Sequence, residues 1–427
     1  MTLAADVIGS RFGRNTFLLV RANVITQGLL LAATPILTRF FRPEDFGIAG
    51  LLLVWAALFS AVASFRFEWS IPSAQTDEDA EALAALALLL VSGLAIALLL
   101  ALTVPDQRAL FGLFGMDPIA LSPLVPALGF AGSMGLVLSS VYVRLGDMGR
   151  VSFSRYVQSI TQLVVSLLSG FAGLGALGLA LGYTLSAVVG AMTLLLGLPM
   201  RLAGVLRRTG ALIASVKRYF RQASLSTAVS VVNFFFGNAL PLLLLVGYSA
   251  REVGFYFVAV RLASAPTALI SSGISSSFWS EAAALAKTDP LRLRAFYLKT
   301  VRRLALFSIP VVLGCLAAPL FLPFILGTHE WGEIGIVVAA CIPQIVGVLI
   351  FSSTNHLIVY DRQGYQLFSD LLSIAGSVAV LWFAVTLKLP FWVAIFIISN
   401  VVLLAYLVRF ALHLRANSEA VRAHAKL

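Results

Sequence analysis

The chain has 427 residues, of which 60% are hydrophobic and only 11% are charged, and its formal net charge is +11. Soluble domains are about 45–50% apolar and about 25% charged, so this composition excludes an ordinary soluble protein and indicates that a lipid bilayer is the solvent. Continuous apolar runs exclude a β-barrel, whose strands would show short segments of alternating polarity. The predicted fold class is therefore all-α, a polytopic membrane protein.

Charged residues divide the chain into apolar segments of the length that a membrane helix requires, about 20 residues for a hydrocarbon core of about 30 Å. Residues 1–14 lack the apolar core of a secretory signal, so the first helix is expected to stay in the mature protein. A glycine-rich stretch at 170–178 interrupts an uncharged run and predicts a helical hairpin. Twelve transmembrane helices are predicted near 16–38, 45–64, 81–104, 118–143, 151–171, 176–199, 222–247, 253–278, 300–325, 333–358, 365–387 and 389–412.

The distribution of basic residues predicts which side of the membrane each loop faces. With the N-terminus in the cytoplasm, 24 of the 30 Lys and Arg fall on the cytoplasmic side, and the positive-inside rule then places both termini there. Anionic head groups of membrane lipids attract such loops. These lipids explain the net charge, and no nucleic acid is expected as a partner.

The two halves of the chain resemble each other around a basic linker. Each half opens with a helix that carries a proline near its outer end, Pro35 or Pro241, and its second helix starts with an acidic residue and a glycine. The predicted domains are an N-terminal six-helix bundle at 1–200, a basic cytoplasmic linker at 201–221, and a C-terminal six-helix bundle at 222–427 that ends in a short cytoplasmic tail. An axis along the membrane normal would relate the two bundles, a common plan of transporters.

Motifs for ATP hydrolysis and metal binding are missing from the sequence. No lysine follows a glycine, so there is no phosphate-binding loop of the Walker type. The four histidines are scattered, and no metal site is expected. Asp77 and Asp79 match the Asp-x-Asp pattern of metal-dependent glycosyltransferases, but acidic residues there also favour the positive end of the third helix dipole. The protein is predicted to be no enzyme and to hold no cofactor, and a coupling ion, proton or sodium, stays open.

Polar residues inside the predicted helices are the usual mark of a translocation path. If the eighth helix starts near Glu252, nine residues at about 1.5 Å each place Arg261 about 13 Å deep, close to the bilayer midplane. A phosphate or pyrophosphate suits a guanidinium there, because it accepts two parallel hydrogen bonds; a structural ion pair or snorkelling toward the surface is the alternative. Asp370 is a weaker case, because it could reach the cytoplasmic interface. Neutral polar residues within spans either line a cavity or join helices: Asn23, Gln27, Asn233, Asn238, Gln344 and Asn355.

Five segments in chain order resemble one known family. They read TPILTRFFRPEDFG at 34–47, RFEWSIP at 66–72 followed by the acidic stretch 77–81, GALGLALG at 175–182, RLASAP at 261–266 with its continuation to 278, and DRQG at 361–364 followed by Asp370. They are similar to the polysaccharide/O-antigen flippase family, the polysaccharide biosynthesis transporters, of the multidrug/oligosaccharidyl-lipid/polysaccharide (MOP) superfamily. The resemblance covers nearly the whole chain.

The resemblance implies a flippase that carries undecaprenyl-pyrophosphate-linked oligosaccharide or polysaccharide repeat units from the cytoplasmic to the outer leaflet of the bacterial cytoplasmic (inner) membrane by alternating access. This lipid-linked glycan is the expected substrate, and a glycan polymerase and other assembly proteins are expected partners. Arg261 is expected to contact the pyrophosphate. Arg66 and Glu68, at the cytoplasmic mouth of helix two, are expected to be entry contacts or a gate ion pair, with a plain interfacial pair as the alternative. Arg21 and Arg144 are lesser candidates for the same mouth.

Three rival interpretations stay open. A drug or organic-ion antiporter of the same superfamily would share the twelve-helix plan but is expected to use intramembrane carboxylates, whereas the deep charge here is an arginine. A membrane glycan polymerase or ligase usually carries a large extracytoplasmic catalytic loop, and the sequence predicts none. A purely structural membrane scaffold fits poorly with a buried arginine.

Overall fold

The computed structural model describes residues 11–103, 121–198, 209–238, 240–263, 285, 290–327, 329–351 and 363–424. Within these ranges every regular element is a helix, and eight helices are long and apolar enough to cross a membrane. The number is nine if α14 (Ile334–Ala340) and α15 (Ile342–Phe351), bent by 46° at their break, form one span. The all-α polytopic fold class is confirmed. Each of the twelve predicted segments contains helix where it is described, and the total of twelve spans stays a prediction.

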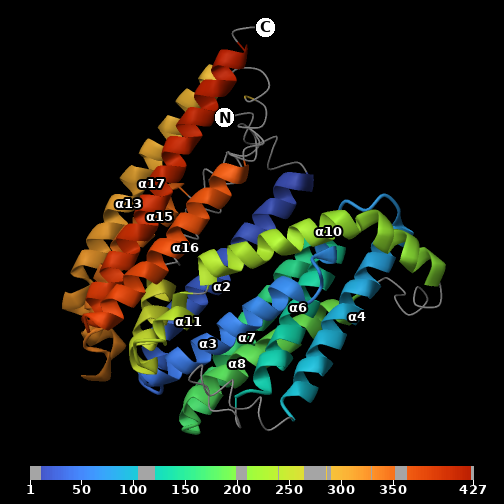
Figure 1. Ribbon diagram of the computed structural model, residues 1–427. Helices are drawn as coiled ribbons and strands as arrows, with labels where there is room; N and C mark the ends of the chain where they lie inside the picture. The colour runs from blue at the N-terminus through green and yellow to red at the C-terminus, as the bar shows by residue number, and fades with distance from the viewer. Residues whose placement is uncertain are drawn as a thin grey trace. The chain divides into compact units, whose positions relative to one another are not determined.

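The chain forms two compact units, Met1–Leu245 and Val246–Leu427. In the first unit α7 packs against α2 and α8, and α6 packs against α3, α4 and α8 (Figure 1). Its elements are α2 (Arg11–Leu37), α3 (Pro43–Val62), η1 (Phe67–Trp69), α4 (Asp77–Ala101), α6 (Leu124–Leu145), α7 (Met148–Phe171), α8 (Gly175–Leu195), α10 (Thr209–Asn238) and α11 (Leu240–Leu244).

Small residues bring α7 and α8 together as a hairpin. A β-carbon on Gly178 would lie 2.6 Å from the Ser169 hydroxyl oxygen, and one on Gly182 would also meet a hydroxyl oxygen of α7, that of Ser166. Such small residues let two membrane helices approach closely, where van der Waals packing replaces the hydrophobic effect. The turn between them contains Gly173, whose φ of 70° is a conformation that glycine adopts without strain. The predicted hairpin is confirmed.

The second part of the predicted linker is helical. α10 begins at Thr209 and packs against α3 and α4 of the first unit (Figure 1). Tyr219 and Ala223 are buried in a hydrophobic cluster with side chains of α4, α6 and η1, because the apolar residues of this basic segment lie on one helical face. The division between the units falls after Leu245, whereas the predicted boundary at 201–221 stays a prediction.

The second unit consists of long helices and a broken pair. α13 packs against α14 and α15, and α17 packs against α15 and α16. Its elements are a helix at 250–263, α13 (Pro290–Leu326), η2 (His329–Trp331), α14, α15, α16 (Gln363–Thr386) and α17 (Phe391–His424).

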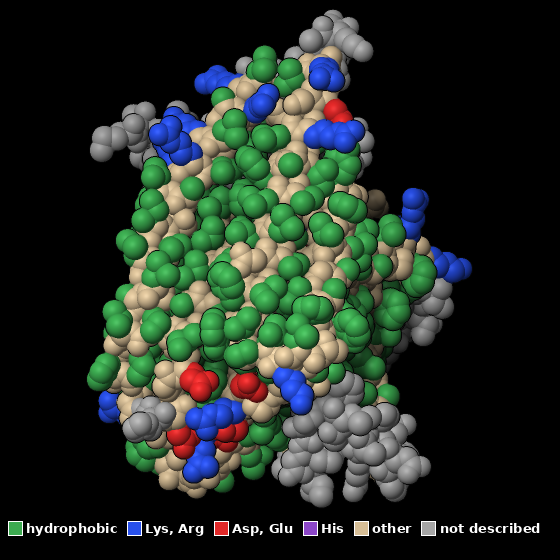
Figure 2. All heavy atoms as spheres, turned by 60° about the vertical axis from the view of Figure 1, so that its left-hand side comes forward, with side chains coloured by type: hydrophobic (Ala, Val, Ile, Leu, Met, Phe, Trp, Pro, Cys, Tyr) green, Lys and Arg blue, Asp and Glu red, His purple; other side chains and the backbone are tan. Residues whose placement is uncertain are grey.

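α13 and α17 are longer than the predicted helices at 300–325 and 389–412. Their 37 and 34 residues correspond to about 55 Å and 51 Å, well beyond a hydrocarbon core of about 30 Å. Figure 2 shows a face with a wide hydrophobic band and with charged side chains at both ends. Hydropathy marks only the part of a helix that lies in lipid, so it does not predict the basic first turns of α13 or the last turns of α17.

The acidic residue of the repeated motif has the same role in both halves. At the start of α3 the Asp45 carboxylate accepts a hydrogen bond from the Arg42 backbone N–H at 2.8 Å. At the start of the helix at 250–263 the Glu252 carboxylate accepts one from the Ser249 backbone N–H, also at 2.8 Å. Each carboxylate thereby satisfies a backbone donor just ahead of its helix and lies at the positive end of the helix dipole.

Candidate functional site

The connection between α3 and α4, residues 63–76, carries the predicted site residues Arg66 and Glu68 and contains a strained turn. Phe65 and Arg66 have left-handed backbones, with φ of 50° and 54°, at a cost of about 1–2 kcal/mol per residue. The chain then enters η1, whose Phe67 is buried together with Ile71 in a cluster with side chains of α4, α6 and α10. Burial of these apolar side chains offsets the strain of the turn.

Arg66 and Glu68 form an ion pair within this connection. The Arg66 Nη1 donates to Glu68 Oε1 at 3.2 Å, and the Arg66 guanidinium carbon lies 5.0 Å from the centre of the Trp69 ring. The Glu68 side chain is only 2% exposed, and its second oxygen, Oε2, has no hydrogen-bond partner among the described residues. A buried carboxylate with one ionic partner depends strongly on that partner. The structure thus contains the ion pair between Arg66 and Glu68. Its role as a gate or as an entry contact for substrate stays a prediction.

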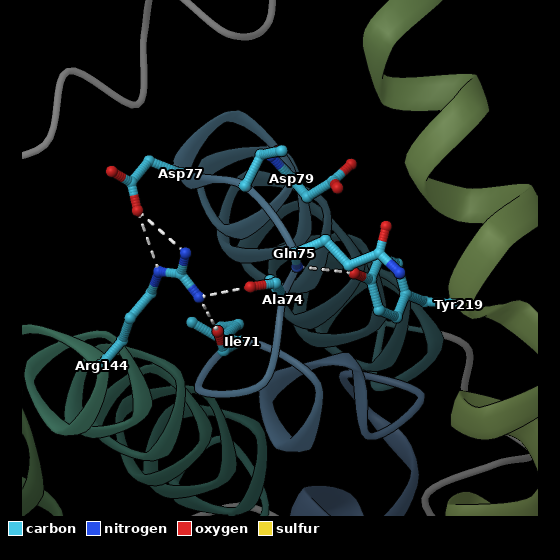
Figure 3. Close-up of polar contacts among 8 residues, drawn as sticks. Ile71, Ala74, Gln75, Asp77, Asp79, Arg144 and Tyr219 are labelled. Carbon is cyan, nitrogen blue, oxygen red and sulfur yellow. Dashed lines mark hydrogen bonds and ion pairs between the residues drawn. The ribbon is translucent and has the colours of Figure 1, made fainter.

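Arg144, at the end of α6, binds residues 71–77 at the end of the same connection and the start of α4 (Figure 3). Its Nη1 donates to the carbonyl oxygens of Ala74 at 2.8 Å and Ile71 at 3.3 Å. Its Nε and Nη2 both donate to the Asp77 carboxylate, at 3.2 Å and 2.9 Å. All three guanidinium nitrogens are thus engaged with the protein. In this structure Arg144 holds the loop, and its predicted contact with substrate stays a prediction.

Side chains of α10 also bind the connection between α3 and α4. The Gln75 backbone N–H donates to the Tyr219 hydroxyl at 3.0 Å (Figure 3). Arg218 forms an ion pair with Asp79 at 2.8 Å, and the Ser215 hydroxyl donates to the other Asp79 oxygen at 2.7 Å. Asp77 and Asp79 are therefore partners of Arg144 and Arg218, and the described residues contain no group of three His, Cys, Asp or Glu that could hold a metal ion.

Replacing Arg144 with lysine is expected to lower the free energy of unfolding by about 1.5–3 kcal/mol, because the three donors of an ammonium group share one nitrogen and cannot reach the acceptors that the three separate guanidinium nitrogens reach. The measurement is thermal unfolding of the purified protein in detergent. Arg422→Lys, at an exposed position near the end of α17, is the control and should leave the unfolding temperature unchanged. An unchanged temperature for Arg144→Lys would show that the connection does not depend on these contacts of Arg144.

The remaining predicted site residues lie elsewhere. Arg21 is exposed on α2, where its Nε donates to the Tyr156 hydroxyl of α7 at 3.5 Å. Arg261 is partly buried on the helix at 250–263 of the second unit. The connection at 63–76 thus gathers Arg66, Glu68 and Arg144, while Arg21 belongs to the seam between α2 and α7.

A buried ion pair in the second unit was not predicted. Asp370 of α16 pairs with Arg409 of α17, and their side chains are 4% and 5% exposed. The Arg409 Nε also donates to the Ser369 hydroxyl at 2.9 Å, and its guanidinium carbon lies 5.2 Å from the centre of the Tyr406 ring. A signal for this pair exists in the sequence, because Arg409 falls inside the predicted apolar helix at 389–412.

Comparison with protein families gives one match over most of the chain. The family described as "Polysaccharide biosynthesis protein" matches residues 36–335. No curated protein sequence matches the chain.

Solved structures resemble the fold over nearly the full length. A structure of the lipid II flippase MurJ in an inward closed conformation has a TM-score of 0.71 at 12% identity, covering 93% of this chain and 88% of that one. An inward-facing multidrug resistance MATE family transporter of the MOP superfamily has a TM-score of 0.63 at 16% identity, covering 96% of each chain. A MOP superfamily transporter from Pyrococcus furiosus has a TM-score of 0.54 at 17% identity, covering 97% of each. At these identities the likeness shows the fold alone.

Proposed function

Since the chain belongs to the polysaccharide biosynthesis protein family and shares its fold with transporters of the MOP superfamily, we propose that it is a transporter and not an enzyme, and that it is a flippase for lipid-linked glycans. Its substrate would be an undecaprenyl-pyrophosphate-linked oligosaccharide or polysaccharide repeat unit. The two bundles would move it from the cytoplasmic to the outer leaflet of the bacterial inner membrane by alternating access, while the lipid tail stays in the bilayer.

The residue that carries this proposal is Arg261, a positive charge within the predicted eighth transmembrane helix. Arg261 lies partly buried on the helix at 250–263, eleven residues after the helix begins at residue 250, which is about 16 Å at 1.5 Å per residue. A guanidinium at this depth attracts an anion, and a pyrophosphate offers the paired oxygens that its planar donors fit. Arg66 would meet the same head group first, at the cytoplasmic mouth.

A drug or organic-ion antiporter is the second candidate, because a multidrug MATE transporter shares the fold. A site for cationic drugs needs a carboxylate whose charge is available to the drug. Asp370, the carboxylate that sequence analysis singled out within a span, is instead neutralised by Arg409. This pairing supports the anionic substrate over the cationic one.

The proposal is tested by reconstituting the purified protein in liposomes with a defined undecaprenyl-pyrophosphate oligosaccharide. Transfer between leaflets is followed by the accessibility of the sugar to a lectin or glycosidase added outside. We expect transfer that depends on the protein, and an imposed proton or sodium gradient would accelerate it if that ion is coupled. Absence of transfer, together with transport of an organic cation, would replace the flippase by the antiporter.

The proposed orientation, with both termini in the cytoplasm, predicts which positions an impermeant reagent reaches. In a background without Cys315 and Cys341, Lys217→Cys on α10 is expected to resist a membrane-impermeant thiol reagent in intact cells and to react after permeabilisation. Ala172→Cys, exposed in the turn between α7 and α8, should react in intact cells. The opposite pattern would invert the topology.

A further inference from the structure

The exposed surface of α2 has an apolar side and a polar side. At about 100° per residue, Arg21 lies on the same side as Phe17, Val24 and Ile25, whose side chains are 59%, 38% and 47% exposed. Asn23 and Gln27 are also exposed, but they lie about 120–160° around the helix from Arg21. The buried Ala22, Thr26 and Ala33 lie between these two sides and form the ridge that packs into the unit.

Two neighbouring residues of α7 reach the opposite sides of α2. Tyr156 accepts the hydrogen bond from Arg21 on the apolar side. Arg155, partly buried, donates through Nη1 to the side-chain oxygen of Asn23 on the polar side. Among the described residues neither arginine makes a salt bridge with a carboxylate. On the polar side of α2 there is therefore a positive charge, that of Arg155, whose hydrogen-bond partner among the described residues is a neutral amide.

The partial burial of Arg155 on α7 makes this charge costly. It lies seven residues after Met148, about 10 Å along the helix, and the rest of α7 beyond it is uncharged. A partly buried cation whose hydrogen-bond partner among the described residues is a neutral amide is costly, and such a group typically marks the path of a ligand. The amides of Asn23 and Gln27 can both donate and accept hydrogen bonds, which suits phosphate oxygens and sugar hydroxyls.

We propose that Arg155, with Asn23 and Gln27, is a pyrophosphate contact of the first bundle. The inference rests on the proposed function and names a subsite for the head group of the same substrate. Arg155 exchanges its hydrogen bond to Asn23 for two hydrogen bonds to phosphate oxygens, and the released amide binds the neighbouring oxygen or sugar. No covalent bond changes in this step.

The test compares binding of two lipids to the purified protein in nanodiscs, undecaprenyl-pyrophosphate oligosaccharide and undecaprenyl monophosphate. Arg155→Gln is expected to weaken binding of the pyrophosphate lipid about 10- to 100-fold, the loss that follows from removing hydrogen bonds to a charged group. Binding of the monophosphate should fall much less, and Arg155→Lys should recover part of the difference. Arg221→Gln, at an exposed position of α10, is the matched control and should bind both lipids like the wild type.

The outcomes separate this inference from the function on which it rests. A wild-type protein that binds neither lipid contradicts the flippase itself. A wild type that prefers the pyrophosphate lipid, with an Arg155→Gln variant that keeps the same preference, overturns the subsite and leaves the flippase standing. If Arg155→Gln does not fold, the same binding comparison is made with Gln27→Ala, which changes an exposed position. We expect this variant to bind the pyrophosphate lipid several-fold more weakly than the wild type. Binding of that lipid equal to the wild type would overturn the subsite.

Discussion

Replacing Arg261 with alanine is expected to reduce leaflet transfer of the lipid-linked glycan by about 100-fold or more. The proposed contact is a guanidinium with a pyrophosphate away from bulk water, and loss of one partner from such a pair costs several kcal/mol, because the other charge is left without compensation. The measurement is the initial rate of transfer in proteoliposomes, normalised to the amount of folded protein. Arg261→Lys should keep part of the activity, because it retains the charge but loses the planar pair of donors.

Arg251 supplies the matched control on the same helix. It is exposed at the start of the helix and donates to the Glu330 carbonyl oxygen at 3.1 Å. Arg251→Ala should keep transfer near the wild-type rate. Full activity in Arg261→Ala with normal insertion would show that Arg261 is structural, whereas loss of activity accompanied by a lower unfolding temperature would assign the effect to folding.

Replacing Asp370 with alanine is expected to cost about 3–5 kcal/mol of folding free energy, which would remove much of the folded protein. The change would leave Arg409 charged and 5% exposed inside the second unit without its counter-ion. The double variant Asp370→Leu/Arg409→Met should recover most of the stability, because apolar residues of similar volume replace a buried pair at little cost. Thermal unfolding in detergent measures both effects.

A second ion pair on α17, this one at the surface, is the control for this prediction. Arg415 and Glu419 form an exposed pair one helical turn apart at 3.3 Å, with side chains 71% and 36% exposed. A surface pair contributes about 0–1 kcal/mol, so Glu419→Ala should have little effect on the unfolding temperature. If Asp370→Ala proves as stable as the wild type, the carboxylate is no structural counter-ion, and it becomes a candidate for binding a coupling cation.

Several features of the fold and the family could be predicted from the sequence because they depend on local properties of the chain. A helix that lies in lipid needs a continuous apolar segment, so hydropathy located the helices, and the glycines at 170–178 located the turn between α7 and α8. The family resemblance rested on short segments in chain order, and the family match confirms it. Arg66 and Glu68 are two residues apart, so the sequence alone could suggest their pairing.

The remaining features depend on residues that are distant in the sequence. Asp370 meets Arg409, and Asn23 meets Arg155, only because the packing of α16 on α17 and of α2 on α7 brings them together. Arg144 binds backbone carbonyls, which every residue carries and no sequence pattern identifies as acceptors.

The sequence by itself therefore determined the solvent, the helical class and the family, because burial of apolar segments in lipid is a property of each segment alone. Which charges are compensated was decided by tertiary structure, because a charge inside a membrane protein is balanced by whatever group the packing places within a few ångströms of it.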